Sequence, residues 1–158
     1  MGMMEKLDVQ ADLAREYLTF RLGDEEYGID ILKVQEIRGY ENPTRIANAP
    51  HFLKGVVNLR GTIVPIVDLR MRFGCSSAEY NAFTVSIVLH IGQRTIGVVV
   101  DSVSDVMEIP AEAMRTAPEM TSAVDASYIR GLAQVGERMV ILLDIEAMIK
   151  SPDFGLVD

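Results

Sequence analysis

Residues 20–29 read FRLGDEEYGI, and residues 89–98 read LHIGQRTIGV. Both glycines of the first stretch recur in the second stretch at the same displacement of 69 residues. Each stretch has an apolar alternation, a polar turn that contains glycine, and a second alternation, which is the pattern of a β-hairpin. The pair therefore predicts that one structural unit occurs twice in the chain.

A second block of sequence repeats in the same order. Residues 55–69 (GVVNLRGTIVPIVDL) correspond to residues 131–145 (GLAQVGERMVILLDI), at a displacement of 76 residues. Each copy ends in an aspartate and an apolar pair at i, i+4 spacing, which predicts a short helix with Asp68 or Asp144 as its N-cap. The longer second copy has its extra residues between the two blocks, where prolines and serines predict a loop at 110–128.

The composition agrees with an all-β fold that is rich in short strands. Hydrophobic residues make up 49% and charged residues 24% of the chain, which suffices for a packed core. Two units of about five strands each predict two small β-barrels with short capping helices, at residues 17–82 and 83–150, because closure protects sheet edges. Barrels this small are marginal alone, so we expect them to pack together around a groove, as one domain overall. Residues 1–16 are expected to form a flexible leader and residues 151–158 a short tail.

Charge and motif content argue against several function classes. The net charge of −8 disfavours nucleic acid or an anionic membrane as the main partner. The single cysteine, Cys75, cannot form an intrachain disulfide, which favours a reducing, cytoplasmic location, and no apolar run reaches membrane-span length. No zinc, nucleotide-loop or nucleophile motif occurs, so we expect no catalytic site, cofactor or metal. A hydrolase that depends on Cys75 is the enzymatic alternative.

The sharpest local signal is the turn around Arg60. The stretch from Asn58 to Gly61 predicts a tight turn between two strands, with a positive φ at Gly61. Such a turn holds the Arg60 guanidinium on a rigid support, suited to bidentate contact with a carboxylate. That carboxylate belongs either to a partner protein or to a neighbour in this chain such as Glu36, and the sequence favours neither. Pro65 in the following strand predicts an edge strand or a bulge.

The repeated stretches, with residues 34–37 (VQEI) and 97–101 (GVVVD), resemble the CheW family of chemotaxis coupling proteins. The resemblance covers roughly residues 17–150 and is strongest to the enteric-bacterial members. It implies two intertwined SH3-like five-stranded barrels without catalytic activity. It also implies an adaptor, monomeric when free and recruited to receptor arrays at the inner membrane, that connects methyl-accepting chemotaxis receptor tips to the regulatory domain of the histidine kinase CheA. The alternative is an adaptor in a related pathway, such as twitching or surface sensing.

The resemblance further implies two docking faces. The expected kinase-binding residues are Leu18, Ile31 and Val34. The expected receptor-binding residues are Val34, Glu36, Lys54, Arg60 and Gly61, with Val85 and Val103 on the second barrel's side of the groove. Ile31 and Val34 are also interpretable as ordinary barrel core, because valines occupy the equivalent positions of the second copy.

Overall fold

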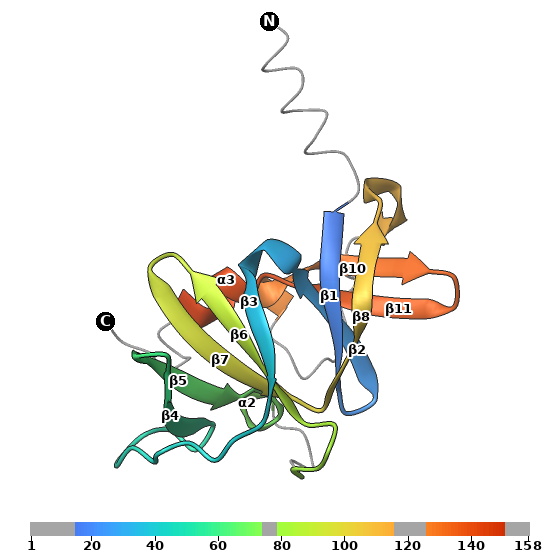
Figure 1. Ribbon diagram of the computed structural model, residues 1–158. Helices are drawn as coiled ribbons and strands as arrows, with labels where there is room; N and C mark the ends of the chain where they lie inside the picture. Colours follow the sequence, from blue (N-terminus) through green and yellow to red (C-terminus); the bar gives the residue numbers. More distant parts are fainter. Residues whose placement is uncertain (1–14, 74–78, 116–125, 151–158) are drawn as a thin grey trace, which may run out of the picture.

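The computed structural model describes residues 15–73, 79–115 and 126–150, and this part of the chain is mainly β (Figure 1). The first copy of the repeat contributes β1 (Arg15–Leu22), β2 (Glu25–Asp30), the 3-10 turn η1 (Ile31–Lys33), β3 (Val34–Gly39), β4 (Leu53–Leu59), β5 (Thr62–Asp68) and α2 (Leu69–Arg72). The second copy contributes β6 (Val85–Ile91), β7 (Arg94–Val100), β8 (Ser102–Ile109), η2 (Ala111–Ala113), β9 (Met114–Arg115), η3 (Ala126–Tyr128), β10 (Ile129–Val135), β11 (Arg138–Leu143) and α3 (Ile145–Lys150).

The two copies exchange strands. Sheet A has the order β8-β1-β2-β11-β10-β9, and sheet B has the order β3-β6-β7-β5-β4. Each sheet thus combines the first hairpin of one copy with all the later strands of the other. The expected division between residues 82 and 83 does not separate the sheets, because β3 pairs with β6 and β8 pairs with β1 across it. This exchange is the intertwining that the family resemblance implies.

All four hairpins predicted from the repeats form. The pairs β1–β2, β4–β5, β6–β7 and β10–β11 are antiparallel. In each sheet a parallel pair, β2–β11 or β5–β7, joins the two hairpins. The prediction of an edge strand at Pro65 is wrong, since β5 lies between β4 and β7. The proline is tolerated there because the pairing with β7 begins only at Ile66, so its missing N–H does not interrupt that ladder.

The segment predicted as a loop at 110–128 is partly ordered into regular structure. It contains η2, η3 and the two-residue strand β9, which pairs with β10 and makes sheet A six-stranded. The predicted five strands per sheet are therefore exceeded in sheet A. Residues 116–125 of this segment lie outside the described residues.

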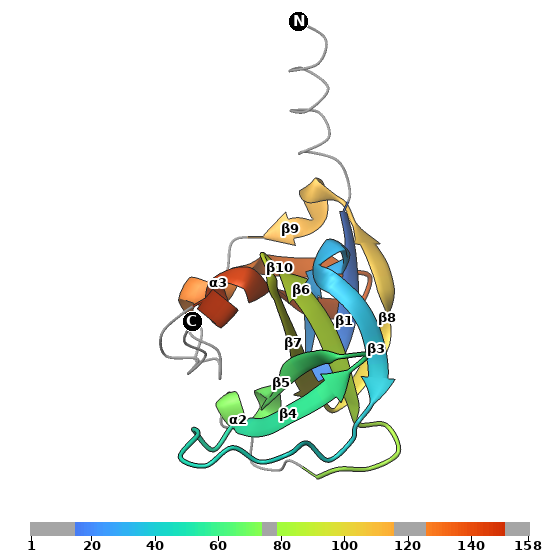
Figure 2. The same ribbon diagram turned by 60° about the vertical axis from the view of Figure 1, so that its left-hand side comes forward.

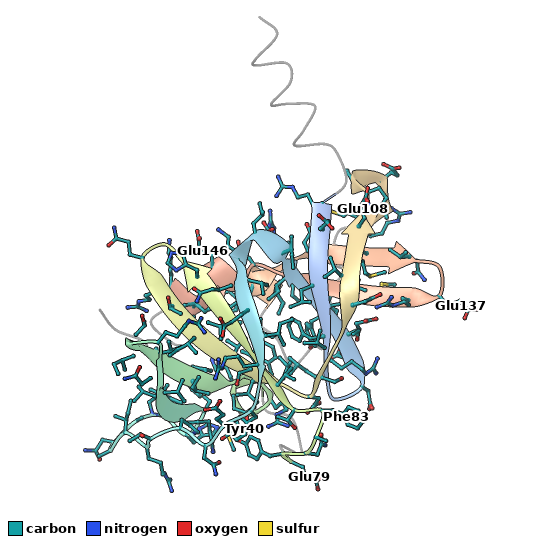
Figure 3. All side chains as sticks on the ribbon, viewed as in Figure 1. Tyr40, Glu79, Phe83, Glu108, Glu137 and Glu146 are labelled. Atoms are coloured by element: carbon teal, nitrogen blue, oxygen red, sulfur yellow. The ribbon has the colours of Figure 1, made fainter. Side chains whose placement is uncertain are left out.

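The main core lies between the two sheets, where side chains fill the space between the ribbons (Figure 3). Phe20 and Tyr27 of sheet A and Ile87 and Val98 of sheet B are all buried in it. Burying one such side chain contributes about 1.5–3 kcal/mol. Each sheet also has a smaller core cluster of its own on its other face. The shared core therefore holds the two sheets against each other.

Both predicted helix caps are confirmed. The Asp68 carboxylate accepts a hydrogen bond from the backbone N–H of Arg70, and Asp144 Oδ1 accepts one from Ala147 at 3.0 Å. The apolar pairs that follow both caps are buried in the main core. The predicted helix stops, at Gly74 and at 151–152, fall outside the described residues. Within the part of the chain that the structure describes, no helix is long and apolar enough to cross a membrane.

Candidate functional site

Two equivalent edge strands, β3 and β8, dominate one side of the molecule. Each stands at the end of its sheet, and the two run in opposite directions (Figures 1 and 2). Both pairings contain a register shift at the same place in the repeat. Such a bulge changes which side chains of a strand share a face.

The bulge in β3 lies between Val34 and Glu36. Because of it, Val34 is opposite Leu89 and Ile37 is opposite Ile87, and both partners belong to the main core. Glu36 instead lies opposite a residue of sheet B's own core cluster. The strand thus presents its apolar residues toward the inter-sheet core and its carboxylate toward the opposite face.

The equivalent strand β8 repeats this arrangement. Val103 is opposite Phe20 and Val106 is opposite Leu18, so both valines face the main core, while Asp105 faces away. Val34, Val85 and Val103 are half-buried against that core, whereas Ile37 and Val106 are 44% and 49% exposed. We call this set the apolar rim: Val34, Ile37, Val85, Val103 and Val106.

A charged cluster occupies the other face of β3. Arg60 contacts Glu36, and Arg38 contacts both Glu36 (Nη1 to Oε1, 3.2 Å) and Glu41 (Nη2 to Oε1, 2.9 Å). The hydrogen bond from Arg60, with a second from Arg38, holds the pKa of Glu36 below its usual value. The Glu36 carboxylate is therefore ionised, and this charged cluster comprises Glu36, Arg38, Glu41 and Arg60.

The turn that carries Arg60 forms as predicted. Arg60 and Gly61 have φ of +51° and +88°, and two positive φ values in succession are typical of a type I′ hairpin turn. The side chain of Asn58 accepts a hydrogen bond from the N–H of Gly61 at 2.8 Å, which fixes the turn. Arg60 pairs with Glu36 inside this chain, yet its side chain is 63% exposed. An ion pair this exposed contributes little to stability, so its main effect is to orient the guanidinium.

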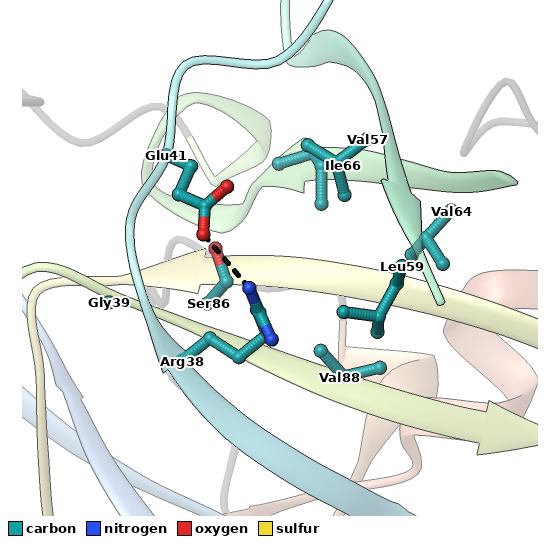
Figure 4. Close-up of a pocket in the computed structure, with 9 residues that line it drawn as sticks. All are labelled: Arg38, Gly39, Glu41, Val57, Leu59, Val64, Ile66, Ser86 and Val88. Atoms are coloured by element: carbon teal, nitrogen blue, oxygen red, sulfur yellow. Dashed lines mark hydrogen bonds and ion pairs between the residues drawn. The ribbon is translucent and has the colours of Figure 1, made fainter. Parts of the chain in front are cut away.

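An apolar pocket lies next to the charged cluster, in the gap between the edge strands β3 and β4 (Figure 4). The ion pair between Arg38 and Glu41 lies on one side of it (Figure 4). Its apolar lining comes from Val57, Leu59, Val64, Ile66 and Val88. Within the described ranges, no group of three His, Cys, Asp or Glu side chains is placed to hold a metal ion. The chemistry available here is apolar burial beside oriented charges, which suits protein recognition.

The expected kinase-binding residues differ in accessibility. Leu18 is only 2% exposed and packs in the main core, because its strand β1 is covered on both sides by β8 and β2. Ile31 and Val34 are half-buried and rest on that core, so they combine core packing with partial exposure. Leu18 therefore packs beneath the surface, while Ile31 and Val34 are partly accessible at it.

The expected receptor-binding residues separate into three places. Val34, Val85 and Val103 belong to the apolar rim, while Glu36, Arg60 and Gly61 lie on the opposite face of β3. Lys54 is the second residue of β4 and precedes Arg60 by six residues, which is roughly 20 Å along an extended strand. Its ammonium group lies 5.8 Å from the centre of the Tyr80 ring, in a different environment from the charged cluster.

Sequence reasoning missed two exposed apolar residues of this region. Leu32 is 86% exposed in the middle of η1, where its N–H donates to Asp30 Oδ1 at 2.9 Å. Two adjacent apolar residues on one helical turn cannot both face the core, and this rule could have identified Leu32 beside Ile31. Ile37 was not identifiable in this way, because only the bulge in β3 determines which face it occupies.

Comparisons with known proteins agree with this architecture. The profile of the family described as "CheW-like domain" matches residues 16–153. The chain is 56% identical to the chemotaxis protein CheW of Klebsiella aerogenes, over 92% of this chain and 88% of that protein. It is 35% identical to the probable chemotaxis protein CheW of Rhizobium etli, over 88% and 90% of the two chains.

A solved structure gives the same answer for the fold. The crystal structure of the scaffolding protein TtCheW from Thermoanaerobacter tengcongensis superposes with a TM-score of 0.79 at 28% identity, covering 89% of this chain and 91% of that one. The fold is accordingly the mainly β arrangement of two SH3-like subdomains. The chain belongs to the CheW-like family of chemotaxis proteins, and it is a non-enzymatic adaptor.

Proposed function

We propose that this adaptor connects the cytoplasmic tips of methyl-accepting chemotaxis receptors to the regulatory domain of the histidine kinase CheA. The observation that supports this most strongly is a pair of neighbouring exposed features: Leu32 on the turn η1, and the edge strand β3 with its apolar rim and its charged cluster. Two separate features allow two partners to bind at the same time. The coupling then arises because binding differs between the states of the assembly, without a chemical step in the adaptor.

The kinase-binding face is formed by Ile31, Leu32 and Val34. Leu32 offers an almost fully exposed apolar side chain, which a partner would remove from water. The neighbouring ion pair between Lys33 and Glu146 (3.0 Å) joins η1 to α3 and holds this turn in place. The turn that carries Leu32 is therefore already ordered before a partner binds, so little conformational entropy is lost on binding.

The receptor-binding face combines the charged cluster with the rim valines on both sheets. Arg60 is held by Glu36 but keeps donors free for the solvent side, so it can add a contact to a partner carboxylate or carbonyl. We further propose that the free adaptor is a cytoplasmic monomer that is recruited to receptor arrays, with residues 17–82 and 83–150 as the two halves that exchange strands.

The test is co-sedimentation of the adaptor with CheA and with membranes that contain receptors, with each partner omitted in turn. We expect Leu32→Asp to abolish the adaptor-dependent pelleting of CheA with receptor membranes, and Arg60→Ala to reduce pelleting of the adaptor with receptor membranes when CheA is omitted. The matched control is Arg130→Ala, an exposed arginine on β10 distant in sequence from both faces. Equal pelleting of the wild type and all three variants would contradict the assignment. Preference for the kinase of another signalling pathway over CheA would contradict the choice of partner.

A further inference from the structure

A second pocket lies under the connection between β3 and β4. It is open to solvent, has a volume of about 430 Å³, and is lined by residues from the 40–54 segment and by Tyr80. Neither the apolar rim nor the charged cluster contributes to its lining. The pocket is therefore separate from both faces described above, apart from Lys54, which the family resemblance associates with receptors.

The lining of this pocket is cationic although the protein is acidic. Arg45, His51 and Lys54 line it, and none of its lining residues is Asp or Glu. Within the described part of the chain, Arg45 and Lys54 make no ion pair, and the ammonium group of Lys54 contacts only the Tyr80 ring at 5.8 Å. In a chain with a net charge of −8, two cations without carboxylate partners in one pocket create a local attraction for anions.

One wall of the pocket is held rigidly by Tyr80. Its hydroxyl donates to Asp68 Oδ2 at 2.8 Å, its ring stacks on Tyr40 at 4.3 Å between centroids, and the Arg70 guanidinium lies 4.8 Å from the ring. Burial, together with the bond to Asp68, raises the pKa of the Tyr80 phenol, so it remains a donor at all physiological pH values. The nearby Glu79 side chain is exposed and points away at the lower edge of Figure 3. It is not among the residues that line the pocket.

The opposite wall is fixed by the backbone. Thr44 and Val56 exchange two hydrogen bonds of 2.8 and 2.9 Å, and the N–H of Leu53 donates to the Pro50 carbonyl at 3.0 Å. The approach is so close that a Cβ on Gly55 would lie 2.0 Å from the Thr44 carbonyl oxygen. The segment that carries Arg45 is thus anchored on both sides, and little ordering entropy is lost when a ligand binds.

We propose that this pocket docks an acidic segment of a partner protein, in which several Asp or Glu side chains lie within a few residues. Arg45 and Lys54 bind the carboxylates, and the stacked tyrosines support the backbone of the segment. The cations are accessible to water, so each contact is weak and screened by salt, and one small anion gains little. Several contacts along one chain act together, which favours a segment over an isolated anion. This inference goes beyond the proposed function, because it needs neither Arg60 nor the apolar rim.

The test measures fluorescence anisotropy of a labelled octapeptide of alternating glutamate and glycine, titrated with the full chain at low ionic strength. The neutral comparison is the same peptide with glutamine in place of glutamate. We expect binding of the glutamate peptide only, with an affinity that falls about tenfold on Arg45→Glu and by a similar factor as salt rises. Arg130→Glu changes the net charge equally, outside the pocket, and should leave the affinity within about twofold.

Three results would overturn the proposal. Equal affinity for the glutamate and glutamine peptides would remove the role of charge. Equal losses in Arg45→Glu and Arg130→Glu would reduce the effect to the net charge of the protein. Complete displacement of the peptide by inorganic phosphate, at matched ionic strength, would make the pocket a small-anion site. Circular dichroism of each variant checks that it is folded, and Arg45→Gln repeats the test without charge reversal.

The same measurement separates this inference from the proposed function. Arg60→Ala should retain full affinity for the glutamate peptide while losing co-sedimentation with receptors. If Arg60→Ala pellets normally and Arg45→Glu still loses the peptide, the receptor assignment fails and the pocket stands. If Arg60→Ala behaves as expected and the peptide never binds, the pocket assignment fails alone.

Discussion

The strands β3 and β8 are the same element of the repeat, and each carries a carboxylate that pairs with an arginine. The two arginines, Arg60 and Arg138, differ strongly in the number of their hydrogen-bond partners. In sheet B, Arg60 contacts Glu36 alone among the described residues and extends into solvent. In sheet A, Arg138 donates to Asp105 (Nη1 to Oδ2, 3.1 Å), to Glu26 (Nε to Oε1, 3.1 Å) and to a buried threonine. Arg138 is therefore held by acceptors inside the chain, whereas the Arg60 guanidinium stays accessible.

The difference comes from the position of each arginine in its hairpin. Arg60 occupies the turn itself, with positive φ, whereas Arg138 is the first residue of β11 and lies over sheet A. The fully buried Thr19 donates to Asp105 Oδ1 at 2.6 Å and thereby joins β1, β8 and β11. A guanidinium with several fixed acceptors has little left to offer a partner, so we expect Arg138 to serve stability and Arg60 to serve binding.

The largest expected difference between the copies lies at the helix caps. Arg70→Met removes the cationic partner of Asp68, which is completely buried and bonded to the Arg70 guanidinium at 2.9 and 3.0 Å, and leaves it only the Tyr80 hydroxyl and a backbone N–H. An unpaired buried carboxylate costs about 3–5 kcal/mol, measured as the free energy of unfolding in urea. Asp144→Ala at the half-exposed cap of the second copy should cost about 0.5–2 kcal/mol. Equal losses in the two variants would mean that the caps are equivalent after all.

The next prediction compares the two arginines directly. Arg138→Ala should lower the free energy of unfolding by about 1–2 kcal/mol, because Glu26 and Asp105 lose their common donor in a partly exposed setting. Arg60→Ala should leave the urea midpoint unchanged and instead weaken receptor binding. A loss of stability in Arg60→Ala as large as in Arg138→Ala would show that the ion pair between Arg60 and Glu36 also stabilises the fold.

Substitution can separate the binding role of the apolar rim from its packing role. Ile37→Asp should weaken partner binding by about tenfold, since the side chain is partly exposed and offers apolar area to a partner. Val34→Asp places a carboxylate against the main core, so it should also lower the melting temperature. Isothermal titration with CheA together with thermal denaturation distinguishes the two effects. A variant Ile37→Asp that binds normally would remove Ile37 from the binding face.

The smallest expected effect is on acid stability. Hydrogen bonds from Arg138, and then from Thr19, lower the pKa of Asp105 to about 2, and Arg138 also lowers that of Glu26. A carboxyl with a lowered pKa in the folded state stabilises the fold above its unfolded pKa near 3.8, and this contribution disappears as the pH falls toward 2. Urea midpoints measured from pH 5 to pH 2 should therefore fall less steeply in Arg138→Ala than in the wild type. If the urea midpoints of the two proteins fell in parallel with pH, Arg138 would not stabilise the fold through Asp105 and Glu26.

Local features of the fold were accessible from the sequence, and long-range ones were not. The hairpins are predictable because each is encoded by an alternation of apolar residues around a glycine turn. The helix caps at Asp68 and Asp144 are predictable because a cap depends on residues close together in the chain, and both features occur in each copy of the repeat. The exchange of strands depends on β3 meeting β6 and β8 meeting β1, and nothing in a single strand specifies its partner. It is implied by the family resemblance, whereas reasoning from the residues alone placed each barrel in one half of the chain.

The candidate site was predictable to the same extent. The turn at Arg60 and its pairing with Glu36 were within reach, because both groups are chemically distinctive. The burial of Leu18 was missed because an alternating pattern does not show which strands lie inside a sheet with both faces packed against other side chains. The bulge in β3 separates Glu36 from Val34 and brings Ile37 to the rim, and a register shift of this kind leaves no trace in the residue types. Lys54 was grouped with Arg60 although β4 carries them far apart.

The exchange of strands between the sheets has a consequence for the origin of the chain. A polypeptide with only one copy of the repeat would leave its first hairpin without a neighbour, and two such polypeptides could complete each other only by reciprocal swapping. The present molecule is equivalent to that swapped homodimer with its two subunits fused end to end. Because its two copies lie in one polypeptide, they need not have the same sequence, and a substitution in one copy is not imposed on the other.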